Sequence, residues 1–356
     1  MRMLRHQLPV RSPLDAPALL GAGGRARAAG ASSRAALEGL LARTYRADEV
    51  VLCGSGTHAL QLAIEAAADR AGRGALVALP AFTCYSVATA AVGAGVPITL
   101  YDVDPATLAP DLGSLRRALE DGARTVVVSH LHGHAVPWDA ITTLTAGFGA
   151  IPIEDAAQGH GATWRGRPLG ALGPASVLSF GRGKGWTGGG GGALLLRGPL
   201  AGTAAQLRAR LARPRRTGPV AISAGAQWAF GRPSIYGLLM AVPWLALGET
   251  VYHDPTPPAA LPAYAAGLLL RTRDAALYEA ALRRATGQAF ARVLARAGTA
   301  GMIRPVPGTD PGYLRFPIRL PGGLSGLEAG ARRGGADAAS LRRLGIFASY
   351  PQTLAE

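Results

Sequence analysis

Short apolar runs alternate with amphipathic stretches along residues 49–197 of this chain. The runs have the length of buried strands, and the stretches between them space their apolar residues three and four apart, as one face of a helix does. Strands that alternate with helices predict an α/β fold with a mostly parallel central sheet, which binds ligands at the carboxyl ends of its strands. We predict strands within 49–56, 74–80, 97–104, 124–130, 150–156, 175–181 and 191–197, and helices at 57–72, 85–95, 111–122 and 138–149.

The rest of the chain has a less regular pattern. Residues 199–213 have a helical pattern, whereas residues 214–262 are rich in proline, glycine and aromatic residues and predict no clear element. A long amphipathic helix is predicted at 273–298, followed by a strand at 313–320 and a helix within 326–346. These last elements predict a smaller carboxy-terminal domain.

The length and composition fit two folded domains of unequal size. The chain has 356 residues, of which 49% are hydrophobic and 17% charged, as is typical of a globular protein with a large core. We expect an N-terminal arm at 1–30, a large domain at 31–250 and a small α+β domain, shortened in comparison with a full one, at 251–356.

The net charge of +15 raises the question of an acidic partner. The arginines are scattered, and no zinc-finger, RNP or helix-turn-helix pattern accompanies them, so we expect no nucleic-acid binding. One local cluster precedes the apolar stretch 234–248, which leaves contact with an anionic membrane surface as the alternative to a helix and a buried segment at a dimer interface. The cluster consists of Arg208, Arg210, Arg213, Arg215 and Arg216.

Cysteine usage and the amino terminus favour a cytoplasmic protein. Cys53 and Cys84 form neither a disulfide framework nor a metal-binding spacing. The first residues lack the continuous apolar segment of a signal peptide. The longest apolar run, 235–247, contains Pro243 and is shorter than the roughly 20 residues that span a bilayer.

Lys184 is the only lysine, because the other 36 of the 37 basic residues are arginine. Arginine can replace lysine wherever only positive charge is needed, but only lysine carries a primary amine that can condense with an aldehyde. Lys184 lies in the sequence FGRGKGW, where Arg182 would help to lower its pKa and the small residues would let a cofactor approach the backbone. On these grounds a covalent role and an ordinary surface lysine both remain open.

Three other positions could act with Lys184. Asp155 ends a predicted buried strand, where its carboxylate would either pair with a protonated ring nitrogen or cap the following turn. Gly56 and Thr57 open a predicted helix, whose free N–H groups favour an anion such as a phosphate, although glycine turns before helices are common. Ser179, five residues before Lys184, could add another phosphate contact.

The histidines of the sequence HLHGH would share one face if they lay on a strand. A metal site at His130, His132 and His134 is the alternative to a simple turn at a strand end, but no acid or cysteine stands near them in the sequence, and we expect no metal. His160 is interpreted as a pocket or core residue with a tentative substrate role. The glycine run 188–192 indicates either flexibility or a close approach of backbone to a ligand.

The order of these motifs resembles the DegT/StrS-type sugar aminotransferases, which depend on pyridoxal 5′-phosphate (PLP) and belong to the fold-type-I aspartate aminotransferase superfamily. The similar segments lie within residues 45–197 and are GSGTHALQLAI, LPAFTCYSVATAAVGAGVPITLYDVDP, VVVSHLHGHAVPWDAI, IEDAAQGHGATWRGRPLG and SFGRGKGWTGGGGGALLL. The resemblance implies a three-layer PLP-transferase fold, a homodimer, an amino-acid donor such as glutamate and a keto-sugar acceptor, nucleotide-linked, in surface-glycan or secondary-metabolite biosynthesis.

The resemblance also assigns roles to residues. It implies that Lys184 binds the PLP aldehyde and acts as the acid–base group, while Asp155 holds the pyridine nitrogen. Gln158 would lie near the phenolic oxygen, and Arg182 is a tentative substrate residue. Gly56, Thr57 and Ser179 would bind the phosphate.

The sequence departs from the family pattern at several positions. Cys84, with Tyr85 beside it, occupies the position of an aromatic residue that stacks on the cofactor ring, so either side chain could contact the ring. Gly190 replaces an acid after the lysine, and the asparagine segment that reaches a partner's cofactor has no match. These departures leave a PLP-dependent sugar dehydratase or other lyase, and a non-catalytic regulatory protein with the same fold, as alternatives.

Overall fold

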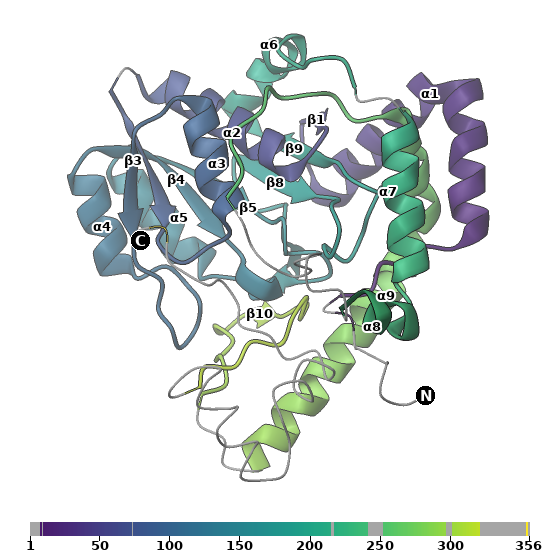
Figure 1. Ribbon diagram of the computed structural model, residues 1–356. Helices are drawn as coiled ribbons and strands as arrows, with labels where there is room; N and C mark the ends of the chain where they lie inside the picture. The colour runs from purple at the N-terminus through teal and green to yellow at the C-terminus, as the bar shows by residue number, and fades with distance from the viewer. Residues whose placement is uncertain are drawn as a thin grey trace.

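A seven-stranded sheet forms the centre of the computed structural model (Figure 1). The structure describes residues 8, 10–72, 74–214, 217–240, 252–296, 301–320 and 354. The sheet has the order β1-β9-β8-β5-β4-β2-β3, in which β9 runs antiparallel to both neighbours and all other pairs are parallel. The prediction of an α/β fold with a mostly parallel sheet is confirmed. The strands are β1 (Glu49–Cys53), β2 (Leu76–Pro80), β3 (Ile98–Tyr101), β4 (Ala123–Ser129), β5 (Ile151–Asp155), β8 (Ala175–Ser179) and β9 (Gly192–Leu196).

Helices cover both faces of the sheet, because successive residues of each strand point to opposite sides. In β1, Val50 and Leu52 join one hydrophobic core, whereas Val51 and Cys53 join the other. One face is covered by α2 (Gly56–Ala71), α3 (Tyr85–Ala94), η3 (Gly198–Thr203) and α6 (Ala204–Ala209). The other is covered by α1 (Ala16–Tyr45), α4 (Leu112–Glu120), α5 (Trp138–Gly147) and α9 (Ala263–Arg296).

Two long helices pack side by side at one end of the sheet (Figure 1). The first, α1, begins after Asp15, whose carboxylate accepts the Ala18 N–H at 2.7 Å, and it continues without a break past residue 30. The second, α9, begins ten residues before the predicted start at 273. Helices α7 (Thr217–Phe230) and α8 (Pro233–Met240) lie in the region for which no element was predicted. A small second sheet contains β10 (Thr309–Asp310), β6 (Thr163–Trp164) and β7 (Arg167–Pro168).

The prediction of a strand at 313–320 is wrong. Tyr313 has φ 44°, in the left-handed region that interrupts an extended chain, and Pro317 has no N–H to donate to a ladder. An isolated bridge between Met302 and Ile318 is the pairing described there. The predicted helix within 326–346 lies outside the described residues.

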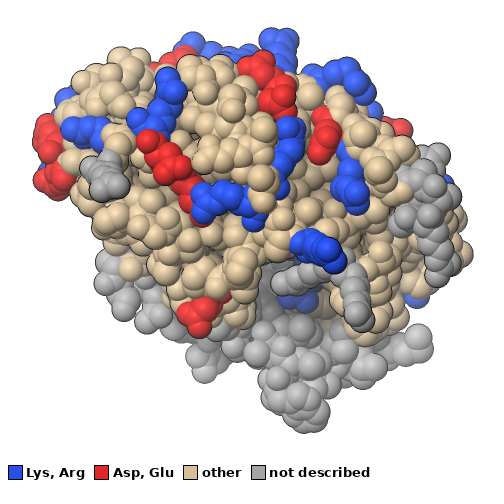
Figure 2. All heavy atoms as spheres, turned by 90° about the horizontal axis from the view of Figure 1, so that it is seen from above, with Lys and Arg blue, Asp and Glu red and all other residues tan. Residues whose placement is uncertain are grey.

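Charged side chains of both signs are interspersed on the face shown in Figure 2. Two arginines of the basic cluster are already paired: Arg208 contacts Glu49 at 2.5 Å, and Arg210 contacts Glu65 at 3.0 Å. This pairing weakens the argument for a membrane-binding cluster, of which Arg215 and Arg216 lie outside the described residues. Within the described part of the chain, no helix has both the length and the apolar character needed to cross a membrane.

Candidate active site

The predicted site residues gather at the carboxyl edge of the parallel strands. Asp155 ends β5 and lies opposite Ser129, the last residue of β4. Ser179 ends β8 and lies opposite Gly192, the first residue of β9. The register of the sheet therefore brings together side chains that are up to 50 residues apart in the sequence.

The Asp155 carboxylate is held by two neutral donors. The Ser129 hydroxyl donates to Oδ2 at 3.0 Å, and the Ala157 N–H donates to Oδ1 at 3.1 Å. The His130 N–H donates to the Asp155 carbonyl at 3.1 Å. These hydrogen bonds hold the carboxylate in a fixed orientation.

The N-terminus of α2 lies directly beside Ser179. Ser55 caps this helix by accepting the His58 N–H at 3.0 Å, and Gly56 and Thr57 form its first turn. A Cβ atom on Gly56 would stand 2.7 Å from Cβ and 2.9 Å from Oγ of Ser179. Glycine thus permits the close approach that places a serine hydroxyl next to the positive end of a helix dipole, a suitable arrangement for a phosphate.

Lys184 lies in the loop after β8, between Gly183 and Gly185, which have φ values of 74° and 81°. Only glycine adopts such a backbone readily, so the sequence GKG is what allows this turn. Burial lowers the pKa of the half-buried Lys184, and the charge of Arg315 lowers it further, while Cys84 and Asp155 act in the opposite direction. The amine therefore has a larger neutral, nucleophilic fraction than an exposed lysine.

The glycine run after Lys184 packs closely against α7. The Gly189 carbonyl accepts the Ser223 hydroxyl at 2.9 Å, and a Cβ atom on Gly189 would stand 2.7 Å from the Val220 carbonyl oxygen. Thr187 donates to the Phe180 carbonyl at 2.9 Å and bonds to Gln227 of the same helix at 3.1 Å. Close backbone packing, and not a general need for flexibility, explains glycine at position 189.

Gln158 and Cys84 border the same region. The His132 N–H donates to Oε1 of Gln158 at 3.0 Å. Cys84 precedes α3, accepts the Ser86 hydroxyl at 3.0 Å and lies close enough to Lys184 to influence its charge, whereas Tyr85 begins the helix. This places the cysteine near the amine.

The sequence of the chain matches a family of known proteins. Residues 23–216, just over half of the chain, match the model of the DegT/DnrJ/EryC1/StrS aminotransferase family. The chain belongs to this family.

Curated relatives match part of the chain. A pleiotropic regulatory protein of Geobacillus stearothermophilus is 33% identical over 144 residues, which are 40% of this chain and 38% of that protein. The L-glutamine:scyllo-inosose aminotransferase of Streptomyces griseus is 37% identical over 141 residues, which are 40% of this chain and 33% of that protein. The chain therefore matches only about a third of the length of such relatives.

Similarity of fold extends further. Spr1654 of Streptococcus pneumoniae, which is named as a sugar aminotransferase, has been solved in PMP and PLP forms. Both forms are 16% identical to this chain and cover 93% of it, with TM-scores of 0.67 and 0.63 over 83% and 84% of the Spr1654 chain. At 16% identity, this agreement concerns the fold alone.

The remaining predicted residues lie around this centre. His160 packs on Trp186, with ring centroids 5.7 Å apart, and burial together with Arg283 lowers the pKa of His160 to about 4. Such a histidine is neutral at pH 7, in keeping with a pocket or core residue. Arg182 is exposed and lies near Tyr236 of α8.

The three histidines of HLHGH do not share one face of a strand. His130 follows the end of β4, and η2 (Leu131–Gly133) turns the chain, with His132 at φ 56°. His130 has an acidic partner that sequence distance concealed, Glu154, at 3.2 Å. Burial lowers the pKa of His132 to about 3 and that of His134 to about 4, so both are neutral at pH 7.

Sequence reasoning missed Ser129 and Arg315. Ser129 is one residue before HLHGH and could have been found by aligning the ends of the predicted strands. Arg315 lies about 130 residues after Lys184, in a segment held by hydrogen bonds from the Gly312 N–H to the Gly133 carbonyl at 2.9 Å and from the Arg315 N–H to the His132 carbonyl at 3.4 Å. No sequence signal distinguishes it from the other arginines.

Proposed function

We propose that this protein is a PLP-dependent aminotransferase that moves an amino group from an amino acid to a keto-sugar. The observation that carries the proposal is the position of Lys184, a half-buried amine with a lowered pKa, near Asp155 at the edge where α2 and Ser179 meet. Membership of an aminotransferase family supports the activity, and the PLP and PMP forms of the Streptococcus pneumoniae relative support the cofactor.

The residues at this edge fit PLP in chemistry and in shape. Asp155 offers an anchored carboxylate to a protonated ring nitrogen, and Lys184 offers an amine to the aldehyde. The contact of Gly56 with Ser179 forms a cradle that a Cβ atom would fill, at a helix N-terminus suited to a phosphate. Gln158 would lie near the phenolic oxygen, and Cys84 near the ring.

When bound, PLP supplies an electron sink for the bonds of the amine-bearing carbon of a substrate. The Nζ atom of Lys184 would move a proton from that carbon to the former aldehyde carbon of the cofactor in one half of the reaction, and in the opposite direction in the other half. Asp155 would keep the proton on the ring nitrogen. The lowered pKa of Lys184 increases the fraction of its amine that is unprotonated and able to accept a proton.

Arg315 is the residue that we assign to the carboxylate of the amino donor. Its side chain is exposed, and its charge acts on both Lys184 and His132. Among the described residues no acid forms an ion pair with it, so its positive charge near the amine lacks a partner. A carboxylate would supply one through charge-assisted hydrogen bonds.

Glutamate is our proposed donor, and a nucleotide-linked keto-sugar of surface-glycan or secondary-metabolite biosynthesis is our proposed acceptor. The printed name of the Streptomyces griseus relative includes L-glutamine and an inosose, so glutamine and a cyclic polyhydroxy ketone belong in the same assay. The family resemblance further supports a homodimer, which light scattering of the purified protein would test, and cysteine usage supports a cytoplasmic location.

Because Lys184 is the only lysine, borohydride gives a sharp test. Purified protein with PLP should show a visible absorbance band, and reduction should fix one PLP on the peptide that contains Lys184. The variant Lys184→Ala should show neither result. Addition of glutamate or glutamine should then deplete the band and release the corresponding 2-oxo acid. Without band or label, the proposed cofactor is wrong.

The regulatory protein among the relatives gives one alternative a specific basis. A regulator that retained the cofactor would show the band and the label but would release no 2-oxo acid. A dehydratase would instead convert the sugar with loss of water and no 2-oxo acid. The presence of both Lys184 and Asp155 favours transfer.

A further inference from the structure

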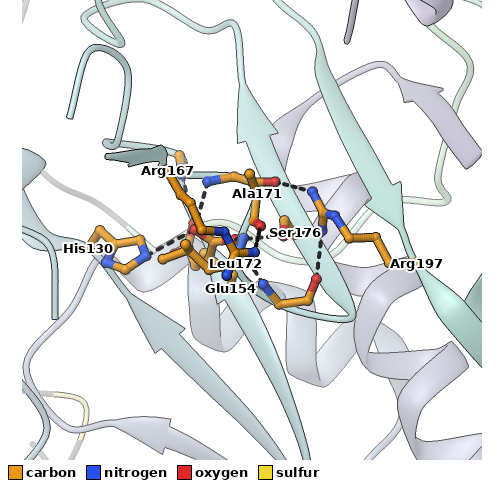
Figure 3. Close-up of polar contacts among 11 residues, drawn as sticks. His130, Glu154, Arg167, Ala171, Leu172, Ser176 and Arg197 are labelled. Atoms are coloured by element: carbon orange, nitrogen blue, oxygen red, sulfur yellow. Dashed lines mark hydrogen bonds and ion pairs between the residues drawn. The ribbon is translucent and has the colours of Figure 1, made fainter. Parts of the chain in front are cut away.

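Glu154, the residue before Asp155, is fully buried and accepts hydrogen bonds from five donors (Figure 3). Because strand residues alternate, its side chain points to the face of the sheet opposite to Asp155. In the tautomer of His130 that carries its hydrogen on Nε2, every partner of the two oxygens is a donor, so only a carboxylate satisfies the site without an unpaired hydrogen. The donors are the N–H groups of Gly170 (2.6 Å), Leu172 (2.8 Å) and Gly173 (3.2 Å), the Ser176 hydroxyl (2.6 Å) and Nε2 of His130 (3.2 Å).

His130 connects this buried carboxylate to Asp155. Its ring contacts Glu154, while its backbone N–H donates to the Asp155 carbonyl at 3.1 Å. The preceding residue, Ser129, donates to the Asp155 carboxylate on the other face. Two successive residues at the end of β4 thus hold two successive residues at the end of β5, one pair on each face of the sheet.

The charge of Glu154 is retained in the folded protein. Burial alone would raise the pKa of Glu154, but His130 and the hydrogen bonds from Gly170 and Ser176 outweigh burial and hold it below its ordinary value. Arg197 supplies a cation nearby, which donates to the Ser176 hydroxyl at 2.9 Å and to the Gly173 carbonyl at 2.6 Å (Figure 3). The carboxylate is therefore a fixed anion at the centre of a buried hydrogen-bond network.

We propose that Glu154 and His130 are positioning residues that fix the orientation of the Asp155 carboxylate toward the cofactor ring. The inference rests on the proposed function, in which Asp155 pairs with the ring nitrogen. It extends to Gln158, because η2 begins directly after His130 and its His132 N–H holds the Gln158 side chain. Outer-shell partners of this kind keep a site within its productive geometry.

A purely structural network would have a different consequence. It would stabilise the fold, and its loss would lower the unfolding temperature without a specific change at the ring nitrogen. A positioning role instead couples the network to PLP affinity and to the pH at which the visible band of bound PLP changes, since both depend on how Asp155 meets the ring.

The variant Glu154→Gln tests this coupling. Glutamine has the size of glutamate, but its amide NH₂ would face groups that themselves donate hydrogen bonds. We expect PLP affinity, measured by titration of the visible band, to fall on the order of tenfold or more. We also expect the pH midpoint of that band to shift. Ser129→Ala removes one bond to Asp155 without touching Glu154, so it should shift the midpoint in the same direction with little loss of thermal stability.

The control is Ile141→Ala, which empties a fully buried position of α5. It should lower the unfolding temperature while leaving PLP affinity and the pH midpoint unchanged. The proposal is overturned if Glu154→Gln folds and keeps the wild-type affinity and midpoint, or if Ile141→Ala alters them equally. Should Glu154→Gln fail to fold, His130→Gln and Ser129→Ala decide by the same measurements. Absence of the band in the wild-type protein would instead refute the proposed function.

Discussion

Replacement of Gly192 by alanine should disturb both the fold and the phosphate cradle. Gly192 is buried at the start of β9, and a Cβ atom there would stand 2.6 Å from the Gly56 nitrogen and from the carbonyl carbon and oxygen of Ser55. These are backbone atoms of the α2 N-terminus, which cannot rotate away as a side chain can. To reach the 3.4 Å at which ordinary contact begins, the two segments must separate by about 0.8 Å.

Overpacking of this kind costs about 1–3 kcal/mol of unfolding free energy. For 356 residues the unfolding entropy is roughly 0.75 kcal/mol/K, so each kcal/mol lowers Tm by roughly 1–2 °C. The same displacement moves the first turn of α2 away from Ser179, and loss of one charge-assisted hydrogen bond to a phosphate, about 1.5–3 kcal/mol, weakens PLP binding on the order of 10- to 100-fold.

Thermal unfolding and titration of the visible band measure the two effects separately. Gly202→Ala is the matched control, because Gly202 is exposed and a Cβ atom there has no neighbour within 4 Å. If Gly192→Ala equals this control in both Tm and PLP affinity, the packing of β9 against the α2 N-terminus does not define the cradle, and the reasoning fails.

Three further predictions concern charge and reactivity. Arg315→Met should raise KM for the amino donor on the order of 10- to 100-fold, with PLP affinity unchanged. The control is Arg319→Met, which replaces an exposed arginine of the same segment and should leave KM unchanged. If the two variants have equal KM values, the assignment of Arg315 is refuted. The pKa of His134 is about 6.5 in the unfolded chain and about 4 in the folded protein, so the unfolded state binds a proton first and the folded protein loses stability as pH falls through this range. His134→Gln should remove roughly 3 kcal/mol of this loss at low pH. Urea unfolding at a series of pH values would measure it. Iodoacetamide should label Cys84 but not Cys53, because Cys53 is buried and its pKa is raised to about 12. Bound PLP should slow the labelling of Cys84. If peptide mass spectrometry finds Cys53 labelled first, the prediction is contradicted.

The sequence predicted the elements of the central sheet well because each strand and helix carries its own periodicity. It failed where local pattern and backbone geometry disagree. The segment 313–320 has the apolar character of a strand, yet Tyr313 and Pro317 interrupt the extended chain. The sequence around residue 30 does not indicate that α1 continues there, because that helix is stabilised largely by packing on α9.

By itself, the sequence determined the alternation that makes an α/β fold and the kinds of side chain available for chemistry. A single primary amine between two glycines and a carboxylate at the end of a buried strand are properties of the chain that need no coordinates. Only the tertiary structure decided which groups meet. Ser129 reaches Asp155 through the register of two parallel strands, His130 reaches Glu154 on the opposite face, and Arg315 approaches Lys184 through a loop about 130 residues later. Distance along the chain carries no information about such contacts, because strand pairing and loop packing set them only after the core has formed.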